Sequence, residues 1–556
     1  MDPILLAELS EQDAVLRHRR LEVWIGSEPT FTVRSSQDPW WLTLAEGGDK
    51  LDRARALLAD LAPRLPTRPQ LLDLPGRHFE GEAAPRFCLG ARFRRGTSPG
   101  AGEVQLTVTP DPGVVEVNTA PAADLATFFA DAEAIYAAAA TAGLSPVRWR
   151  YNGRGSDSGG GGQLTLGGPS AEASPFFRHP ALLPRLIRFL CNHPSLSYAF
   201  ASDCVGSASQ GPRPDEGVRE RFEELQVAVD RLESRGAHLA PPEIWETLAP
   251  LLVDASGNSH RAELNVEKLW NPFLAGRGRL GLVELRSLRM PSSASRLAAM
   301  AALFRALVAR LAAVPYLEPL ADWGASLHDQ LALPTFLDED LRGVLDDLAS
   351  HGLGLGTATT ALLLERPEPL AEVKVDRTTL TVLPAVEFWP LLGDVASQEQ
   401  SGARLVDASI ERVEVRISHD RGADPGRIGA NGWEVPLTSA DSGRRHVAGL
   451  RYRAFLPRPG LHPGLPAQDP LVLTWEREGH RTGVELHGWI PGGGTYPGLP
   501  DDELEAKRRR RERVRIREVT RAALRRPLAG GGVTLDLRRL TALHGADGWT
   551  MTGGGK

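Results

Sequence analysis

Carboxylates and arginines recur at alternate positions within short apolar stretches of this sequence. Glu116 and Asn118 alternate in VVEVN, and Glu284 and Arg286 alternate in LVELRSL. Because successive strand residues point to opposite faces, each pair would share one face of a strand. Charged side chains are rarely buried unless they are paired or bound to a metal. Several such strands could therefore build a polar cleft in which carboxylates hold Mg²⁺ and arginines hold phosphate.

Other stretches carry residues of the same kind. They are Glu28 in GSEPTF, Gln163 and Thr165 in GGGGQLTLGG, Arg261 and Glu263 in NSHRAEL, and the nearby Asn258, His260 and Lys268. An ordinary explanation competes with the polar cleft, because antiparallel sheets often have one wet face that carries paired Glu and Arg. Taken singly, these residues leave both readings open.

The glycine run of residues 155–168, GSDSGGGGQLTLGG, raises the question of a linker or a site. Gly/Ser-rich runs are usually flexible connectors. Here the run leads into a strand-like alternation that a second glycine pair closes. Gly161 and Gly162 could instead let the backbone approach a phosphate or substrate closely at the start of a strand.

Composition limits the class of protein. The chain has 556 residues, 42% of them hydrophobic, which predicts two or three globular domains. The three cysteines, Cys88, Cys191 and Cys204, lie far apart, which disfavours a zinc site and a disulfide framework. The N-terminal residues do not resemble a signal peptide, and no apolar run is long enough to span a membrane. We expect a soluble, cytoplasmic protein.

Common catalytic and nucleic-acid-binding patterns find little support. The sequence has no G-x-x-x-x-G-K-[ST] pattern, no G-x-S-x-G pattern and no H-x-x-x-H pair. The basic run 507–526 could hold nucleic acid. However, glutamates and apolar residues interrupt it and the net charge of the chain is −6, so we expect a solvated basic helix instead.

The pattern of apolar residues predicts a mixed α+β organisation. Strands are expected within 21–33, 103–121 (two, around a Pro-Gly turn) and 280–291, and helices at 50–65, 124–143, 179–193, 215–234 and 292–314, the last with a serine N-cap. After about residue 365, short strands between Gly/Pro/Asp turns suggest a small sandwich. The predicted domains are 1–355 (catalytic), 366–500 (β-rich) and 501–556 (a basic helical or flexible tail).

The order of the motifs adds a resemblance. GSEPTFT, HFEGEAAPRFCLG, DPGVVEVNTAP, GGGGQLTLGG, HPSLSYAF, SASQGPRPDE, GNSHRAELNVEKLWNP, RLGLVELRSLRMP and RYRAFLPRPGLHP together resemble the bacterial family called putative amidoligases, domain of unknown function 2126. The likeness runs from about Trp24 to about Pro500. It implies a distant relationship to glutamine synthetase, with a curved, mainly antiparallel sheet and packed helices in the catalytic domain.

The resemblance also implies a chemistry. A substrate carboxylate would attack the γ-phosphate of ATP, and an amine would then displace phosphate from the acyl phosphate to give an amide. The implied cofactors are ATP and Mg²⁺ (or Mn²⁺), and the implied substrates are an amino acid or peptide with a free carboxylate and an amine donor. The β-rich domain would recognise the substrate or a protein partner.

The resemblance assigns roles to individual residues. Glu28, Glu116 and Glu284 look like metal ligands, Arg286, Arg213 and Arg261 look like arginines that hold phosphate or a substrate carboxylate, and Gly161, Gly162, Gln163 and Asn118 look like cofactor-binding residues. A site of this kind requires the three glutamate carboxyl groups to converge.

One position departs from the family pattern. Gln163 stands where relatives typically have the histidine of a Gly-Gly-Gly-Asn-His motif. Glutamine can coordinate Mg²⁺ through its carbonyl oxygen but cannot replace imidazole as a base. Either the site tolerates glutamine, or this member is catalytically impaired and only binds a nucleotide, a peptide or a protein partner.

Overall fold

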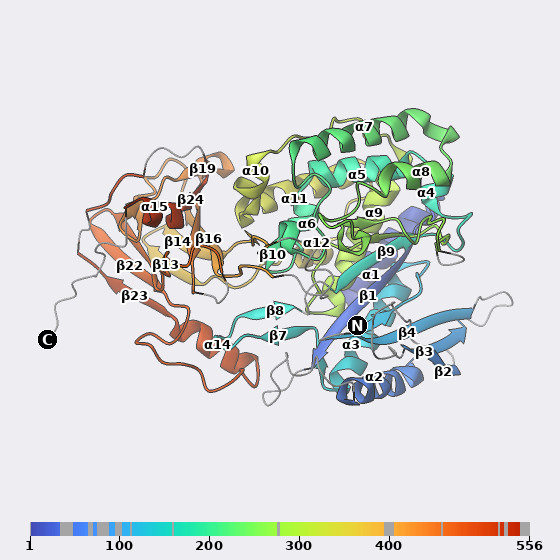
Figure 1. Ribbon diagram of the computed structural model, residues 1–556, viewed down its shortest axis with the longest axis horizontal. Coiled ribbons are helices and arrows are strands. Elements are labelled where there is room, and N and C mark those ends of the chain that lie inside the picture. The colour runs from blue at the N-terminus through green and yellow to red at the C-terminus, as the bar shows by residue number, and fades with distance from the viewer. Residues whose placement is uncertain are drawn as a thin grey trace.

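The computed structural model contains a mixed α and β fold with antiparallel sheets (Figure 1). It describes residues 2–33, 48–64, 70–74, 88–94, 103–111, 114–157, 161–274, 278–393, 405–456, 460–520, 523–527 and 532–544. Within these ranges, no helix combines the length and the apolar character that a membrane crossing needs.

A nine-stranded sheet in the N-terminal half carries the predicted strands. Its order is β11 (Leu264–Asn265), β12 (Val283–Leu285), β9 (Gly162–Gly167), β1 (Trp24–Val33), β5 (Val114–Asn118), β4 (Glu103–Asp111), β3 (Cys88–Arg94) and β2 (Gln70–Leu74), with β6 (Leu144–Ser145) also paired to β1. Neighbouring strands are antiparallel throughout. The stretch after the glycine run is therefore a strand, and the strand predicted within 280–291 is confirmed only over Val283–Leu285.

Strand register gives the sheet one apolar and one polar face around β1, β9 and β12. Leu166 lies opposite both Ile25 and Val283, and all three belong to the hydrophobic core. One residue further along, the pleat reverses the direction of the side chains. Thr165 is accordingly paired with Glu284, and Glu28 is paired with Gln163 on the opposite face.

Helices cover the apolar face. The main ones are α9 (Ala294–Ala313), α3 (Leu125–Thr141) and α1 (Pro3–His18). Helix α9 begins as predicted, because the Ser293 hydroxyl accepts a hydrogen bond from the Arg296 amide at 3.2 Å. A buried ion pair joins all three helices: Asp13 of α1 contacts Arg305 of α9 and accepts from the Leu125 amide of α3 at 3.1 Å.

Further helices pack around the sheet, with α5, α7 and α8 at the top of Figure 1 and α2 at the bottom beside α3. They are α2 (Gly48–Leu61), α4 (Pro175–Arg178), α5 (Leu182–Asn192), α6 (Ser195–Tyr198), α7 (Arg219–Arg235), α8 (Pro241–Leu248), α10 (Ala325–His328), α11 (Pro334–Ser350) and α12 (Thr357–Leu363). The helices predicted at 50–65, 179–193 and 215–234 are thus confirmed, with shifts of a few residues at their ends.

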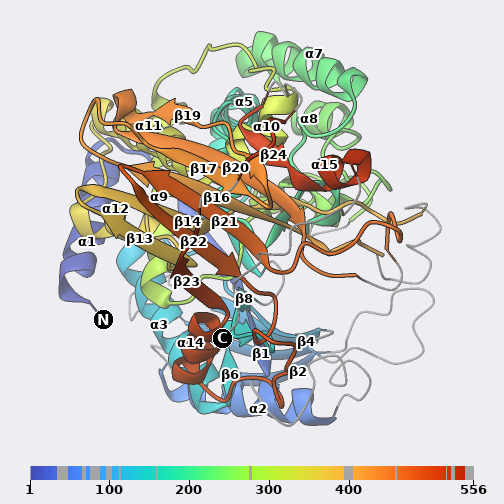
Figure 2. The ribbon, with the colours of Figure 1, turned by 90° about the vertical axis from the view of Figure 1, so that its left-hand side faces the viewer.

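Two further sheets follow residue 370 (Figure 2). They share one apolar core, which includes Val415, Leu450 and Trp475. One contains β13 (Ala371–Val375), β14 (Thr378–Pro384), β16 (Ile410–Ser418), β20 (Arg445–Arg453), β19 (Thr438–Ala440) and β24 (Thr534–Asp536). The other contains β18 (Trp433–Glu434), β17 (Arg427–Ala430), β21 (Leu471–Arg477), β22 (His480–Leu486) and β23 (Val514–Glu518). The short strands predicted after about residue 365 correspond to the start of these two sheets.

Among the contacts that join the C-terminal sheets to the N-terminal half are those of one hairpin and one short strand pair. The hairpin of β7 (Val147–Trp149) and β8 (Gly155–Asp157) reaches toward them (Figure 1), and its Arg154 contacts the half-buried Glu411 of β16. The Tyr452 hydroxyl donates to the same carboxylate at 2.9 Å. In addition, β10 (Cys204–Val205) pairs in parallel with β15 (Glu387–Phe388).

The basic run is part of the fold rather than a tail. Residues 503–512 form α14, and the following Val514–Glu518 is the edge strand β23. Arg509 is only 2% exposed and donates to the Tyr151 carbonyl at 2.8 Å, while Arg510 lies over the Trp149 ring. The helix is confirmed, but the flexible tail predicted for 501–556 is wrong where the structure describes it, because β24 and α15 (Leu537–His544) continue the fold.

Candidate active site on the polar face of the sheet

Five side chains meet on the polar face of the nine-stranded sheet, and we call them the sheet-face cluster. Glu28, Gln163 and Glu284 come from β1, β9 and β12, which are adjacent strands. Lys268 reaches them from the turn after β11, and Arg286 directly follows β12. The alternation of strand side chains brings the three strand residues to one face, although they lie far apart in sequence.

Opposite charges are interleaved within the cluster. The Lys268 ammonium contacts the Glu28 carboxylate and lies 2.7 Å from Oε2 of Glu284. Arg286 contacts the other oxygen of Glu284. The Gln163 side-chain amide is assigned the orientation in which all its hydrogen bonds form. Its nitrogen then donates to Glu28 Oε2 at 2.7 Å and to Glu284 Oε1 at 2.9 Å, and its oxygen accepts from Arg286. Two acids, two cations and one amide therefore form a single network.

Burial shapes the protonation of the two glutamates. Burial raises the pKa of Glu28 above its ordinary value, and the Glu284 charge raises it further, against the opposing effect of Lys268. Burial alone would also raise the pKa of Glu284, but Arg286 and Lys268 together outweigh it and hold that pKa below its ordinary value. The two carboxylates repel each other, so the pair depends on the cations around it.

Arg286 also borders a small pocket. Its Nε donates to the His260 carbonyl at 2.8 Å, which fixes the orientation of the guanidinium, and its side chain is 16% exposed. The other walls of the pocket include Tyr198, Ser202, Cys204 and Gln210. A substrate in this pocket would lie beside the charged network, which makes Arg286 the link between the two.

The predicted set of three metal-binding glutamates is not present in this form. Among the residues that the structure describes, no three His, Cys, Asp or Glu side chains are grouped to hold a metal ion. Glu116 lies opposite Thr30, two residues from Glu28, which puts the two on one face at a diagonal separation of roughly 7–8 Å between Cα atoms. Its carboxylate accepts a hydrogen bond from Asn118 at 2.7 Å. Glu28 and Glu284 converge, whereas Glu116 with Asn118 forms a neighbouring pair.

The glycines before β9 have a packing role in the structure. A Cβ on Gly161 would lie 1.4 Å from the Thr30 hydroxyl oxygen, and one on Gly162 would lie 1.8 Å from the Arg289 carbonyl oxygen. The Gly162 amide donates to the Leu288 carbonyl at 3.2 Å. The predicted close approach is therefore real, but it is to the protein's own chain, which removes the reason for expecting a phosphate cradle here.

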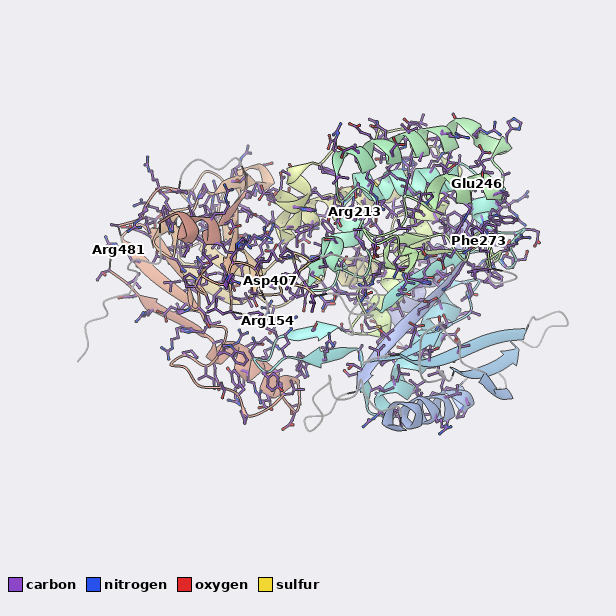
Figure 3. All side chains as sticks on the ribbon, viewed as in Figure 1. Arg154, Arg213, Glu246, Phe273, Asp407 and Arg481 are labelled. Carbon is purple, nitrogen blue, oxygen red and sulfur yellow. The ribbon has the colours of Figure 1, made fainter. Side chains whose placement is uncertain are left out.

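Arg213 does not join the sheet-face cluster, and its predicted role in holding phosphate or a substrate carboxylate stays a prediction. Its side chain is 0% exposed and lies on the helical side of the molecule (Figure 3). All five guanidinium N–H groups have protein acceptors: Asp215 twice, the Ser197 hydroxyl, and the Leu190 and Cys191 carbonyls. With Asp215, Glu216, Glu263, Ser197 and Tyr198 it forms what we call the Arg213 cluster.

Two further outcomes complete the comparison with the sequence. Arg261 lies half-buried in the short turn whose His260 carbonyl anchors Arg286, and its predicted role in substrate binding stays a prediction. Lys268 is the member of the cluster to which sequence reasoning assigned no role. It sits in a turn without strand periodicity, and only its position five residues after Glu263 in NSHRAELNVEK hinted at it.

The family of the chain follows from its match to a family model. A family model described as putative amidoligase enzyme (domain of unknown function 2126) matches residues 98–538. The chain belongs to this family. Comparison with curated proteins gives no match.

The family match covers most of the chain but not the whole cluster. Gln163, Lys268, Glu284 and Arg286 lie inside the matched residues, whereas Glu28 precedes them. The match also starts later and ends later than the resemblance read from the motifs. Glu28 belongs with the others because β1 pairs with β9 in the centre of the sheet.

Proposed function

We propose that this protein is an ATP- and Mg²⁺-dependent amidoligase that joins a substrate carboxylate to an amine through an acyl phosphate. The observation that carries the proposal is the convergence of two buried carboxylates, Glu28 and Glu284, on one cation beside Arg286, in a member of the amidoligase family. Glu28 and Glu284 supply two of the three carboxylates that the sequence suggested, and Glu116 stands one strand away on the same face, so its part in the site stays a prediction.

The residues present fit a divalent cation. Carboxylate and amide oxygens are the ligands that Mg²⁺ and Mn²⁺ favour, and a positive group already lies between the two carboxylates. Glu28 and Glu284 would hold the ion, and Gln163 could add its amide oxygen by turning its side-chain amide over. A bound Mg²⁺ would supply neutralisation of the ATP phosphate charge.

Arg286 would act on the anionic groups of the reaction. A guanidinium binds phosphate or carboxylate oxygens with paired N–H donors, and anchoring on the His260 carbonyl fixes its orientation. Prior orientation matters because phosphoryl transfer depends on positioning and charge stabilisation more than on covalent help from the protein. The amino acid or peptide whose carboxylate is activated would approach from the side of the small adjoining pocket.

The proposal is tested by supplying Mg²⁺, ATP and pools of amino acids and peptides, with hydroxylamine as a general amine. We expect ADP release that depends on a carboxylate compound, together with formation of a hydroxamate. Glu284→Gln should reduce both by about 10²–10³-fold, as for the loss of one preorganised charged group. Glu434→Gln, a surface variant of the Arg427 ion pair, is the matched control and should change neither. ADP release that survives Glu284→Gln would refute this site.

A second candidate, a ligase-fold protein that binds without turnover, is favoured by Gln163 in the centre of the network. Gln163→His should keep or raise ADP release if the glutamine is tolerated. Nucleotide binding by the natural protein without ADP release, combined with turnover by Gln163→His, would instead support the binding-only function.

A further inference from the structure

Lys268 occupies the place in the sheet-face cluster where a metal ion would bind. Its ammonium contacts Glu28 and lies 2.7 Å from Glu284, so it joins the two carboxylates. The Glu284 side chain is 1% exposed and Glu28 is 11% exposed, whereas Lys268 is 34% exposed. The carboxylates are fixed within the sheet, and the lysine enters between them from the accessible side.

The two cations of the cluster differ in how they are held. Arg286 is anchored by its Nε hydrogen bond to the His260 carbonyl, in addition to its contact with Glu284. Among the described residues, the polar partners of the Lys268 ammonium are the two glutamates. Its backbone is secured, since its carbonyl accepts from the Leu280 amide at 2.9 Å. A flexible four-carbon stem on a fixed backbone lets the ammonium move while Arg286 stays.

We propose that Lys268 is an internal competitor for the divalent cation. Its ammonium keeps the Glu28–Glu284 pair together before the ion arrives and withdraws when the ion binds. This inference rests on the proposed function in that it assigns a divalent cation to the same two carboxylates. It adds that the ion enters by exchange with a side chain of the protein rather than by filling an open site.

The exchange has a chemical use. Two buried carboxylates without a cation would repel each other at close range, so a temporary positive group preserves their geometry. Once displaced, the ammonium remains beside the ion with three N–H donors available for an anionic oxygen. Lys268 would then bind a phosphate oxygen of the nucleotide, so binding of the ion would favour binding of the nucleotide.

The decisive measurement is the Kd of Mn²⁺ for the full chain without nucleotide, followed by the electron paramagnetic resonance signal of unbound Mn²⁺. A competitor that fills a site most of the time weakens the apparent affinity by the fraction of time the site is open. Lys268→Met should therefore bind Mn²⁺ about tenfold or more tightly than the natural protein. Lys268→Arg, which keeps the charge, should show no such gain.

Two controls tie any gain to this site. The double variant Lys268→Met with Glu284→Gln should lose it, because one of the two carboxylates is gone. Lys507→Met removes a lysine of similar exposure that pairs with Glu368 on the surface, and it should leave the Kd unchanged. Equal Kd values for the natural protein and Lys268→Met would overturn the proposal, as would a gain that persists in the double variant.

A measurement on the natural protein covers the case in which Lys268→Met does not fold. Acetylation by an amine-reactive reagent, mapped by mass spectrometry, should accelerate at Lys268 when Mn²⁺ is added, with Lys507 as the internal reference. No acceleration would count against displacement.

These readouts separate the inference from the proposed function. Tighter Mn²⁺ binding by Lys268→Met without any ADP release by the natural protein would support the exchange and refute the ligase. ADP release by the natural protein, with the same Mn²⁺ affinity in the natural protein and in Lys268→Met, would support the ligase and refute the exchange.

Discussion

Arg286 and Arg213 both lie among glutamates and aspartates, yet their surroundings differ. In the Arg213 cluster, five fixed acceptors take all five guanidinium N–H groups, and the side chain is fully buried. In the sheet-face cluster, one backbone carbonyl anchors Arg286, while a carboxylate that it shares with Lys268 and the Gln163 amide complete the network. An arginine whose N–H groups are all hydrogen-bonded within the protein stabilises the fold. An arginine that shares its carboxylate partner with a second cation beside a pocket can bind a ligand.

The largest expected effect is on folding. Arg213→Met should lower the free energy of unfolding by about 3–5 kcal/mol, because it leaves Asp215 buried without its partner. Urea unfolding followed by circular dichroism measures it. Arg219→Met removes an exposed ion pair with Glu223 and should lower the free energy of unfolding far less, because solvent screens exposed ion pairs. Similar values for the two variants would break the distinction between the clusters.

Arg286→Met should have the reverse profile. We expect ADP release to fall by about 10²–10³-fold, because an oriented cation is lost from the reacting phosphate. The free energy of unfolding should fall less than for Arg213→Met, because Lys268 remains on Glu284. Steady-state kinetics and urea unfolding of the same preparation check both parts, and full activity would show that Arg286 is only structural.

Alanine substitutions at two glycines should change the free energy of unfolding by smaller amounts of opposite sign. One glycine precedes strand β9 and the other lies in helix α11. Gly161→Ala should destabilise the protein by roughly 1–3 kcal/mol, because the new methyl group would overlap Thr30. Gly343→Ala lies in α11 with nothing near the added carbon, so it should stabilise by about 0.5–1 kcal/mol. Thermal unfolding compares them. A neutral Gly161→Ala would mean that the glycine is not needed for packing.

A further expected effect depends on pH within the Arg213 cluster. Burial raises the pKa of Glu216 to about 8, with contributions from Asp215 and Glu263 that oppose those of Tyr198 and Arg213. A carboxyl group whose pKa is higher in the folded state stabilises the fold while protonated, and this contribution declines as pH rises from about 4.3 toward its folded value. Relative to the natural protein, Glu216→Gln should therefore gain stability between about pH 5 and 8 and level off above that. A pH-independent difference in urea unfolding would exclude it.

Much of the local structure follows from the sequence. The period of apolar residues located the helix of Ala294–Ala313 with its serine cap, and the alternation in GQLTLG located the strand that carries Gln163. The same alternation placed Glu284 on a polar face. Arg213 looked equivalent to Arg286 in sequence, because the position of fixed acceptors around a side chain is not encoded locally. The basic run was expected to be a solvated helix, since nothing in its composition indicates that Arg509 packs against the distant Tyr151.

By itself, the sequence determined the residue types, the faces of the strands on which they stand and the amidoligase family. The tertiary structure decided which of these residues meet. Strand order places β1 and β12 on either side of β9, so Glu28 and Glu284 converge. Glu116 lies on β5, which borders β1 on the side away from β9, and its carboxylate is hydrogen-bonded to Asn118. Lys268 enters only because a turn after β11 directs it across these strands. Periodicity along a chain specifies direction within an element, but distances between elements depend on the packing of the whole fold.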